Sequence, residues 1–447
     1  MLRKYFIYHL YYKYTGQRVF YWKNQFTKTQ WLDTDAVNKK QFENLRSILK
    51  YSYNNIPYYK RRFDEAGIKP ADIREEKDVI RIPTIQKKDI IENYNELFPA
   101  KYNGKTFIRE TSGSSGSPLR LAKGVKSLSV MDAIMYRNYA WFGIDVGEKQ
   151  GRYWGTPLSS FAKLKTQFKD YVLGRIRFSP FDISEKTCLD FYQQLRKYMP
   201  KFVYGYSQTV YRFAYLLDNV NIDLEELKLK AVITTGEMIY SHQLETIEKV
   251  FRCPVTNEYG CTELGIIAMQ CPQKGMHLMT ENLYIEFVKD NRHAVSGEEG
   301  EIVLTELFSD LVPLIRYKIG DIGIRSDNIC TCGRGLPLLK EIKGRSDDFI
   351  ICVNGKQVDP IVFEYILQGL PSSLGKISQF RILQINFATL EIEVCYEGKS
   401  FSRMCSELDS KLKNILGQEF EIKFHRKESL EADASGKLRC FISQLRR

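Results

Sequence analysis

The stretch LKAVITTGE at 229–237 decides the fold class. Its run of apolar and β-branched residues, closed by a glycine, predicts a short buried strand. KFVYGYS at 201–207 precedes it and PVTNEYG at 254–260 follows it, and both show the same pattern. Helical patterns at 210–218 and 242–252 separate the three stretches. This alternation is typical of a mostly parallel sheet covered by helices, so we expect an α/β fold.

The rest of the 447 residues indicates more than one domain. NLYIEFV at 282–288 and GEIVLTEL at 300–307 predict an antiparallel meander. After GRSDDFI the pattern changes to a helix from about 360, strands at 379–386 and 389–397, a helix at 402–416 and a last strand at 420–426. We therefore expect an N-terminal segment at 1–35, a large domain at 36–345 and a small α+β domain at 346–447.

Composition excludes several classes of protein. Hydrophobic residues make up 43% and charged residues 27%, which excludes wholesale disorder. No run approaches the roughly 18 apolar residues that span a bilayer, and the N-terminus lacks the features of a signal peptide. We therefore expect an intracellular, cytoplasmic protein. Its ten cysteines are then reduced thiols, used for packing or for metal.

The net charge of +12 raises the question of two anionic partners, a nucleic acid and a membrane surface. Lysine and arginine are spread along the chain without a recognition motif, so we expect no nucleic-acid partner. In residues 1–35, aromatic residues alternate with basic ones. This segment either packs as a helix on its own domain or lies on the anionic inner face of a membrane. The sequence leaves monomer and homodimer open.

A serine- and glycine-rich stretch, ETSGSSGSPLR at 110–120, lies between two strand-like segments. Glycines at 113 and 116 allow a sharp turn whose N–H groups converge, and the neighbouring hydroxyls add donors. Such a loop suits the phosphates of a nucleotide, although it lacks the Walker pattern. The alternative is a plain hairpin turn.

Five further motifs follow this loop: TTGE at 234–237, NEYGCTE at 257–263, RYKIGD at 316–321, GRSDD at 344–348 and SGKLR at 435–439. Together the six resemble the ordered motifs of the adenylate-forming superfamily, and within it the phenylacetate-CoA ligase and CapK-like branch. The resemblance covers residues from about 40 to the C-terminus. It implies an acyl-CoA-synthetase-like fold with a large N-terminal α/β region and a small C-terminal lid. It also implies two reactions: a carboxylate attacks ATP to give acyl-AMP and pyrophosphate, and an acceptor then displaces AMP.

The resemblance assigns roles to individual residues. Lys437, Glu263 and Thr262 become catalytic, with Glu263 as the Mg²⁺ ligand and Thr262 at the α-phosphate. Asp321 takes the ribose hydroxyls, and Asp347 is the hinge of the lid. The residues that resemblance places around ATP are Thr111, Ser112, Gly113, Ser114, Ser115, Gly116, Gly236, Glu237, Tyr259, Gly260, Asp321 and Arg345. Leu119 stands where most of the superfamily has a lysine, so no phosphate lysine is assigned there.

Two further groups of residues are predicted outside the nucleotide motifs. Tyr206 and Trp154 are the candidates for the acyl pocket, with core packing as the alternative. Cysteine and histidine in CPQKGMH and CTCGR suggest a closed tetrahedral Zn²⁺ site, against reduced core cysteines and a structural histidine. Its proposed ligands are Cys271, His277, Cys330 and Cys332, with Cys261 as a substitute.

These motifs favour an ATP-dependent ligase that activates a carboxylic acid and transfers the acyl group to a thiol such as coenzyme A, in surface polysaccharide biosynthesis. The first alternative delivers the acyl group to an amine or a hydroxyl. The second is a non-catalytic scaffold at a membrane or on nucleic acid, which the joint presence of Glu263, Asp321 and Lys437 disfavours. The acid itself is not identified by the sequence.

Overall fold

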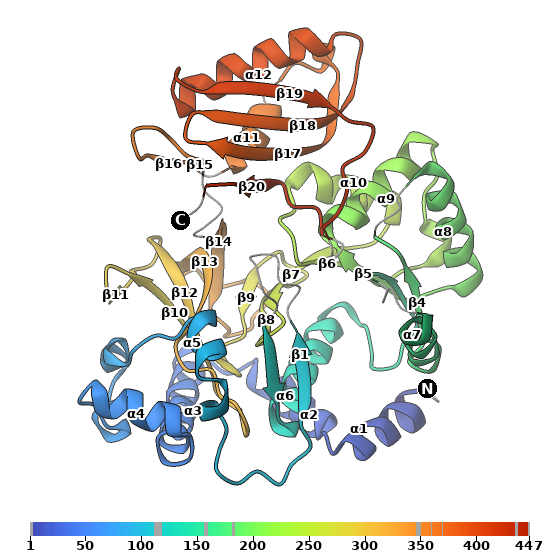
Figure 1. Cartoon of the computed structure of the whole chain (residues 1–447). Coiled ribbons are helices and arrows are strands. Elements are labelled where there is room, and N and C mark those ends of the chain that lie inside the picture. Colours follow the sequence, from blue (N-terminus) through green and yellow to red (C-terminus); the bar gives the residue numbers. More distant parts are fainter. Residues whose placement is uncertain are drawn as a thin grey trace. The chain divides into compact units, whose positions relative to one another are not determined.

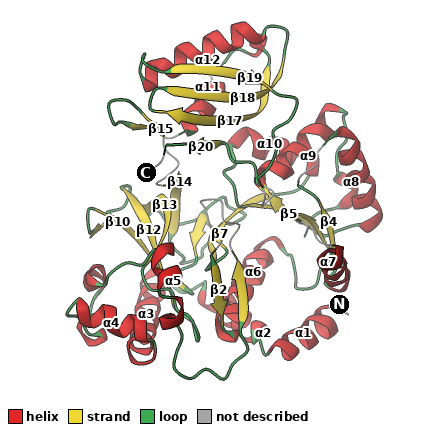
Figure 2. Cartoon of the chain, in the orientation of Figure 1, coloured by secondary structure: helices red, strands yellow, loops and turns green. Residues whose placement is uncertain are grey.

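The computed structural model describes residues 3–110, 119–155, 160–180, 184–345, 350–358, 360–368, 370–433 and 437–445. The chain divides into two compact units, Met1–Ile342 and Lys343–Arg447 (Figure 1). The sequence had indicated a boundary between 345 and 346. Figure 2 shows that both units mix helices with strands.

The N-terminal residues form helices that belong to the large unit. They are η1 (Arg3–Tyr8), α1 (His9–Thr15), α2 (Val19–Thr29), α3 (Thr34–Asn55), α4 (Pro57–Glu65) and α5 (Lys87–Glu92). Asp33 caps α3 by accepting a hydrogen bond from the backbone N–H of Ala36, and Pro57 occupies the first turn of α4. Tyr8, Tyr12 and Phe26 are buried in a shared core with later helices. Three of the aromatic residues in 1–35 therefore pack inside the unit, whereas Phe6, Tyr11, Tyr14, Tyr21 and Trp31 are exposed.

Strands of the large unit form one extended sheet. Among the described residues its order is β11-β10-β12-β13-β14-β9-β8-β7-β6-β5-β3-β4. The bounds are β3 (Gln150–Tyr153), β4 (Arg175–Phe178), β5 (Phe202–Tyr206), β6 (Ala231–Thr235), β7 (Val255–Cys261), β8 (Gly265–Gln270), β9 (Met276–Leu278), β10 (Leu283–Lys289), β11 (Arg292–His293), β12 (Glu299–Glu306), β13 (Tyr317–Ser326) and β14 (Leu338–Arg345). A separate hairpin pairs β1 (Phe107–Glu110) with β2 (Arg120–Lys123).

Strands β4, β3, β5, β6 and β7 are parallel neighbours, which agrees with the predicted α/β class. Successive side chains point to opposite faces. One face packs on α8 (Glu185–Tyr198), α9 (Ser207–Asn219) and α10 (Ser241–Phe251), with Val203 and Val232 in that core. The other face packs on α6 (Val125–Tyr139) and the N-terminal helices, with Phe202 and Ile233 in that core. Helix α7 (Ser160–Val172) connects β3 to β4.

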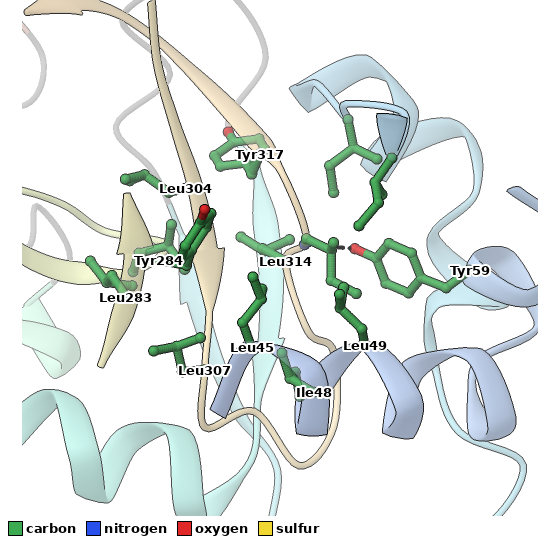
Figure 3. Packing of buried hydrophobic residues seen from close by; sticks show 14 of the residues in the cluster. Leu45, Ile48, Leu49, Tyr59, Leu283, Tyr284, Leu304, Leu307, Leu314 and Tyr317 are labelled. Atoms are coloured by element: carbon green, nitrogen blue, oxygen red, sulfur yellow. Dashed lines mark hydrogen bonds between the residues drawn. The ribbon is translucent and has the colours of Figure 1, made fainter. Parts of the chain in front are cut away.

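A third core lies between α3, α4 and the antiparallel strands β10, β12 and β13 (Figure 3). Leu45 and Leu49 of α3 are fully buried against this part of the sheet. The hydroxyl of Tyr59 donates to the carbonyl of Pro313 at 2.8 Å and accepts from the N–H of Ile315 at 3.1 Å. This packing fixes the segment that leads into β13, on which two residues of the site lie.

The small unit contains a four-stranded sheet of order β19-β18-β17-β20. Its elements are β15 (Ile350–Ile351), β16 (Gln357–Val358), α11 (Ile361–Gln368), β17 (Lys376–Asn386), β18 (Thr389–Glu397), α12 (Phe401–Leu416), β19 (Glu421–Arg426) and β20 (Phe441–Ser443). The predicted helix at 402–416 and the strands at 379–386, 389–397 and 420–426 lie within or close to these elements. Short 3₁₀ turns complete the chain: Pro70–Asp72, Glu76–Arg81, Tyr94–Leu97, Ala140–Phe142, Glu225–Leu227 and Ser372–Leu374.

Candidate active site

The motif NEYGCTE forms the end of β7 and the turn into β8. The two strands are antiparallel and pair Cys261 with Gly265. A Cβ atom at Gly260 would lie 2.5 Å from the carbonyl oxygen of Gly265, so only glycine fits this close approach. Thr262 is exposed and Glu263 is half-buried in the turn. The tight hairpin thereby presents both side chains beyond the end of β7.

Two hydrogen bonds join this hairpin to β13, some sixty residues further along the chain. The hydroxyl of Tyr259 donates to a carboxylate oxygen of Asp321 at 2.5 Å. The hydroxyl of Tyr317 donates to Glu263 at 3.1 Å. The structure therefore brings NEYGCTE and RYKIGD into direct contact, through residues that were predicted separately to hold adenine, ribose and Mg²⁺.

The motif TTGE lies beside NEYGCTE at the carboxyl ends of two parallel strands. Thr235 of β6 is in register with Glu258 of β7. Gly236 has a φ of +79°, a conformation that favours glycine. The carboxylate of Glu237 accepts a hydrogen bond of 2.8 Å from the N–H of Gln208, in the first turn of α9. Carboxyl ends of strands in open α/β sheets are where ligands bind, and Glu237 anchors the start of a helix at this edge.

Several predicted residues are not placed with this group. Thr111, Ser112, Gly113, Ser114, Ser115 and Gly116 lie outside the described residues, between the paired strands β1 and β2, and Asp347 also lies outside them. The backbone of Arg345 ends β14, but its side chain is not described. Lys437 belongs to the small unit, where its backbone N–H donates to Asp433 at 3.2 Å. The roles of all these residues stay predictions.

The aromatic candidates for the acyl pocket gather on one face of the sheet. The rings of Trp154 and Tyr206 are stacked with centroids 4.3 Å apart, and Trp154 also stacks on Tyr204 at 5.4 Å. Tyr153 points to the opposite face and is buried against Phe178. Trp154 and Tyr206 are therefore neighbours, as a shared pocket wall requires.

Glu258, one residue before Tyr259, is a feature that the sequence reasoning missed. Its carboxyl group accepts hydrogen bonds from Tyr139 at 3.0 Å and from Tyr204 at 3.1 Å. Burial raises the pKa of Glu258 to about 7, although both hydrogen bonds and the nearby charge of Arg152 favour its ionised form. The signal available in the sequence was a glutamate inside the buried strand pattern PVTNEYG.

The four predicted zinc ligands also converge. Their side-chain ligand atoms all lie within 4.8 Å of one another, and Cys271, His277 and Cys330 are buried. The sulfur atoms of Cys271 and Cys330 are 3.6 Å apart, and Nε2 of His277 is 3.1 Å from the sulfur of Cys332. Tetrahedral Zn²⁺ with Zn–S of ~2.3 Å and Zn–N of ~2.1 Å separates its ligand atoms by roughly 3.5 to 3.8 Å. Small adjustments would therefore let the group hold the ion.

The histidine of this cluster is prepared for metal binding. Nδ1 of His277 is 3.0 Å from the carbonyl oxygen of Leu336, which fixes that nitrogen as the donor and leaves Nε2 as the acceptor. Burial lowers the pKa of His277 to about 4, so the ring is neutral. Burial raises the pKa of Cys271 to about 12, so a metal ion would have to displace its proton. Among the described residues Cys261, the suggested substitute, is not part of this cluster.

Comparisons with known proteins agree with the motifs. No family model matches the chain. A phenylacetate-coenzyme A ligase of Thermus thermophilus is 25% identical over 347 residues, which is 76% of this chain and 77% of that protein. Protein CapK of Staphylococcus aureus is 25% identical over 322 residues, 71% of this chain and 69% of CapK.

Solved structures support the fold. A 2-hydroxyisobutyryl-CoA ligase in complex with R3-HIB-AMP has a TM-score of 0.76 at 19% identity, and the match covers 94% of this chain and 92% of that one. An O-succinylbenzoate coenzyme A synthetase from Bacillus subtilis, in complex with AMP, has a TM-score of 0.50 at 18% identity, over 74% of this chain and 67% of its own. In its ordered motifs, its curated relatives and its fold, the chain resembles the adenylate-forming superfamily, and within it the branch of the phenylacetate-CoA ligases and CapK.

Proposed function

We propose that this chain, an ATP-dependent, AMP-forming carboxylate ligase by its family, transfers the activated acyl group to coenzyme A. The observation that carries the proposal is the contact between two distant motifs. At the carboxyl end of β7, the hydroxyl of Tyr259 donates a hydrogen bond to Asp321, and the hydroxyl of Tyr317 donates one to Glu263. The curated relatives named phenylacetate-coenzyme A ligase favour the thiol of coenzyme A as the acceptor.

In this proposal ATP lies against the β7–β8 hairpin. The carboxylate of Asp321 accepts hydrogen bonds from both ribose hydroxyls, and Tyr259 holds that carboxylate from the other side while its ring faces adenine. Glu263, held by Tyr317, supplies an oxygen ligand for the Mg²⁺ that neutralises phosphate charge. The substrate carboxylate then forms a bond to the α-phosphorus, and pyrophosphate leaves.

The small unit supplies the positive charge in this proposal. Lys437 lies on a loop before β20, and its backbone is tied to Asp433 by hydrogen bonds of 3.2 Å and 2.8 Å. Its ammonium group would stabilise the charge that develops between carboxylate and phosphate. Asp347 would be the pivot, because it precedes the short strand β15 at the start of the small unit.

We assign Cys271, His277, Cys330 and Cys332 to a structural Zn²⁺. Four protein ligands leave no open coordination position, so the ion would contribute stability rather than chemistry. The cluster ties the turn after β8 to the segment before β14, because Leu336 holds the histidine and Leu338 pairs with it across the strands. The metal would therefore stiffen the chain just before the second unit.

We also propose that the large unit contacts the anionic inner face of a membrane. No described helix is long and apolar enough to cross a bilayer. Residues 1–32 contain six lysines and arginines and no acidic residue. Phe6, Leu10 and Tyr14 are exposed on the N-terminal helices, and Leu164 and Phe168 are exposed on α7. The hydroxyl of Tyr8 donates to the carbonyl of Leu173, just after α7, so the N-terminal helices and the end of α7 are neighbours.

The likeness to CapK suggests surface polysaccharide biosynthesis as the setting. Product analysis separates the two acceptor hypotheses. The purified chain is incubated with ATP, Mg²⁺ and aromatic, fatty, amino and uronic acids, with and without coenzyme A. Formation of AMP and an acyl-CoA thioester supports the proposal. Acyl-AMP that reacts only with an added amine or sugar hydroxyl would instead support the amide or ester ligase, and no pyrophosphate with any acid would refute both.

A further inference from the structure

One face of the parallel sheet carries a polar cavity. Gln150, Arg152 and Trp154 alternate along β3, and the register places Arg152 opposite Tyr204 of β5. These side chains point toward α6, away from the apolar core of α8, α9 and α10. A cavity of about 70 Å³ lies between this face and α6. Its lining includes the tyrosines Tyr136, Tyr139 and Tyr204, two arginines, Arg152 and Arg175, and two acidic residues, Asp145 and Glu148.

Arg152 forms no ion pair within 4 Å among the described residues, although the carboxyl group of Glu258 is near enough to be influenced by its charge. Its Nε atom is buried and has no hydrogen-bond partner among the described residues. Burial and the neighbouring charge of Arg175 lower the pKa of Arg152 to about 10. Two other arginines on this side of the sheet are paired: Arg177 with Asp170 at 2.7 Å, and Arg137 with Glu281. An unpartnered buried donor is costly, so the cavity suits a ligand that completes it.

Arg152, which lines the cavity, also contacts residues of the proposed acyl site. The guanidinium of Arg152 lies 4.6 Å from the ring centroid of Trp154 and 5.2 Å from that of Tyr204. Trp154 stacks on Tyr206, and the hydroxyl of Tyr204 bonds to Glu258. Glu258 is followed directly by Tyr259 of the nucleotide motif. Arg152 therefore lies one contact beyond the residues proposed to hold the acyl chain.

The arginines of the lining favour an anionic oxygen group, because Glu148 is already paired with Lys230 at 2.6 Å and Asp145 accepts from the N–H of Val146 at 2.8 Å. A guanidinium with a free Nε–H binds a carboxylate with good geometry, and tyrosine hydroxyls supply further donors. One water needs roughly 10–15 Å³ and a benzene ring fits a cavity of ~150 Å³, so about 70 Å³ accepts a carboxylate but not a ring. Glu258 does not fill this role: its carboxyl group accepts from Tyr139 and Tyr204, and Nε of Arg152 makes no hydrogen bond to it.

We propose that the acid used by this enzyme carries a second anionic oxygen group at its far end, which Arg152 binds in the cavity that Arg152 and Tyr204 line. The substrate class is then a dicarboxylic acid, with one carboxylate at the nucleotide and the other at Arg152. This inference rests on the proposed function, because it names the substrate of the same site. Arg152 is a specificity-determining residue that touches the tail of the substrate and takes no part in the phosphate chemistry.

The test compares matched acids by the kcat/KM of pyrophosphate release. Adipate is compared with hexanoate, and 4-carboxyphenylacetate with phenylacetate, in the wild type and in Arg152→Met. We expect the wild type to prefer each dicarboxylate by at least tenfold. Arg152→Met should lower kcat/KM for the dicarboxylates about 100-fold, mainly through KM, and change the values for the monocarboxylates less than threefold. Arg152→Lys, which keeps the charge, should retain part of the preference.

Lys149→Met is the matched control, because it removes one positive charge three residues before Arg152. The ammonium group of Lys149 donates to the carbonyl of Tyr198. This variant should leave the preference unchanged. A wild type that prefers the monocarboxylates, or a preference that survives in Arg152→Met, would overturn the inference and leave the ligase activity standing. Absence of pyrophosphate with every acid would overturn both. If Arg152→Met does not fold, the wild-type comparison and Arg152→Lys still decide the question.

Discussion

The buried carboxyl group of Glu258 should make the stability of the large unit depend on pH, and Glu258→Gln should remove that dependence. Glutamine has nearly the same shape and offers hydrogen bonds to Tyr139 and Tyr204, as a protonated glutamic acid does. The difference between the two proteins therefore isolates one ionisation.

The sign follows from the direction of the shift. Burial raises the pKa of Glu258 from 4.5 to about 7 in the folded protein. Below pH 4.5 the group is protonated in the folded and unfolded states. Between pH 4.5 and 7 the unfolded chain ionises first, so the free energy of unfolding falls, and above pH 7 it stays at the lower value. The difference between a pKa of 4.5 and one of about 7 corresponds to about 3 kcal/mol.

The assay is urea denaturation of wild type and variant from pH 5 to 9, followed by the fluorescence of the large unit, which contains all four tryptophans. We expect Glu258→Gln to be the more stable protein at pH 8.5 by up to about 3 kcal/mol, with the advantage vanishing toward pH 5. Glu298→Gln is the control. Its bonds to Arg292 and Lys289 lower the pKa of Glu298 to about 2, so its effect should be constant above pH 6. An equal difference between Glu258→Gln and wild type at every pH would refute the reasoning.

Three further predictions test other parts of the account. Tyr259→Phe removes the hydrogen bond to Asp321 and should raise the KM for ATP about fivefold to tenfold with little change in kcat. An unchanged KM would show that Tyr259 and Asp321 do not act together in binding the nucleotide. Cys332→Ser should lower the bound zinc measured by mass spectrometry and the melting temperature, while Cys405→Ser, on α12, should change neither. Leu164→Ser combined with Phe168→Ser should weaken sedimentation with anionic phosphatidylglycerol vesicles; equal binding of the wild type to neutral vesicles would contradict the membrane proposal.

Prediction of the fold from sequence succeeded where burial is uniform. The three stretches expected as buried strands form β5, β6 and β7, as predicted. Continuous apolar runs bounded by glycine leave the chain few other conformations. The strands β3 and β4 were not predicted. QGRY and RIRF carry arginine on one face, which resembles an exposed edge, and only the packing of α6 and α7 buries that face. Such long-range cover is not encoded in a local pattern.

The site shows the same division. Local motifs indicated Tyr259, Glu263 and Asp321, and the structure brings these three into one group through Tyr317 and the β7–β8 hairpin. The environment of Glu258 depends on Tyr204 and Tyr139, which precede it by 54 and 119 residues in the chain. The raised pKa of Glu258 therefore could not be read from the motif. The convergence of Cys271, His277, Cys330 and Cys332 was predictable because their two short segments each carry a pair, whereas their role as zinc ligands stays a prediction.

The central claim is that motifs scattered along the chain form one site that joins a carboxylate to ATP. Exchange of labelled pyrophosphate into ATP, measured with and without carboxylic acid, tests it most directly because the exchange needs no acceptor. We predict acid-dependent exchange in the wild type and a loss of at least 100-fold in Asp321→Ala and in Lys437→Ala. Exchange that proceeds without any acid, or that persists undiminished in both variants, would contradict the claim.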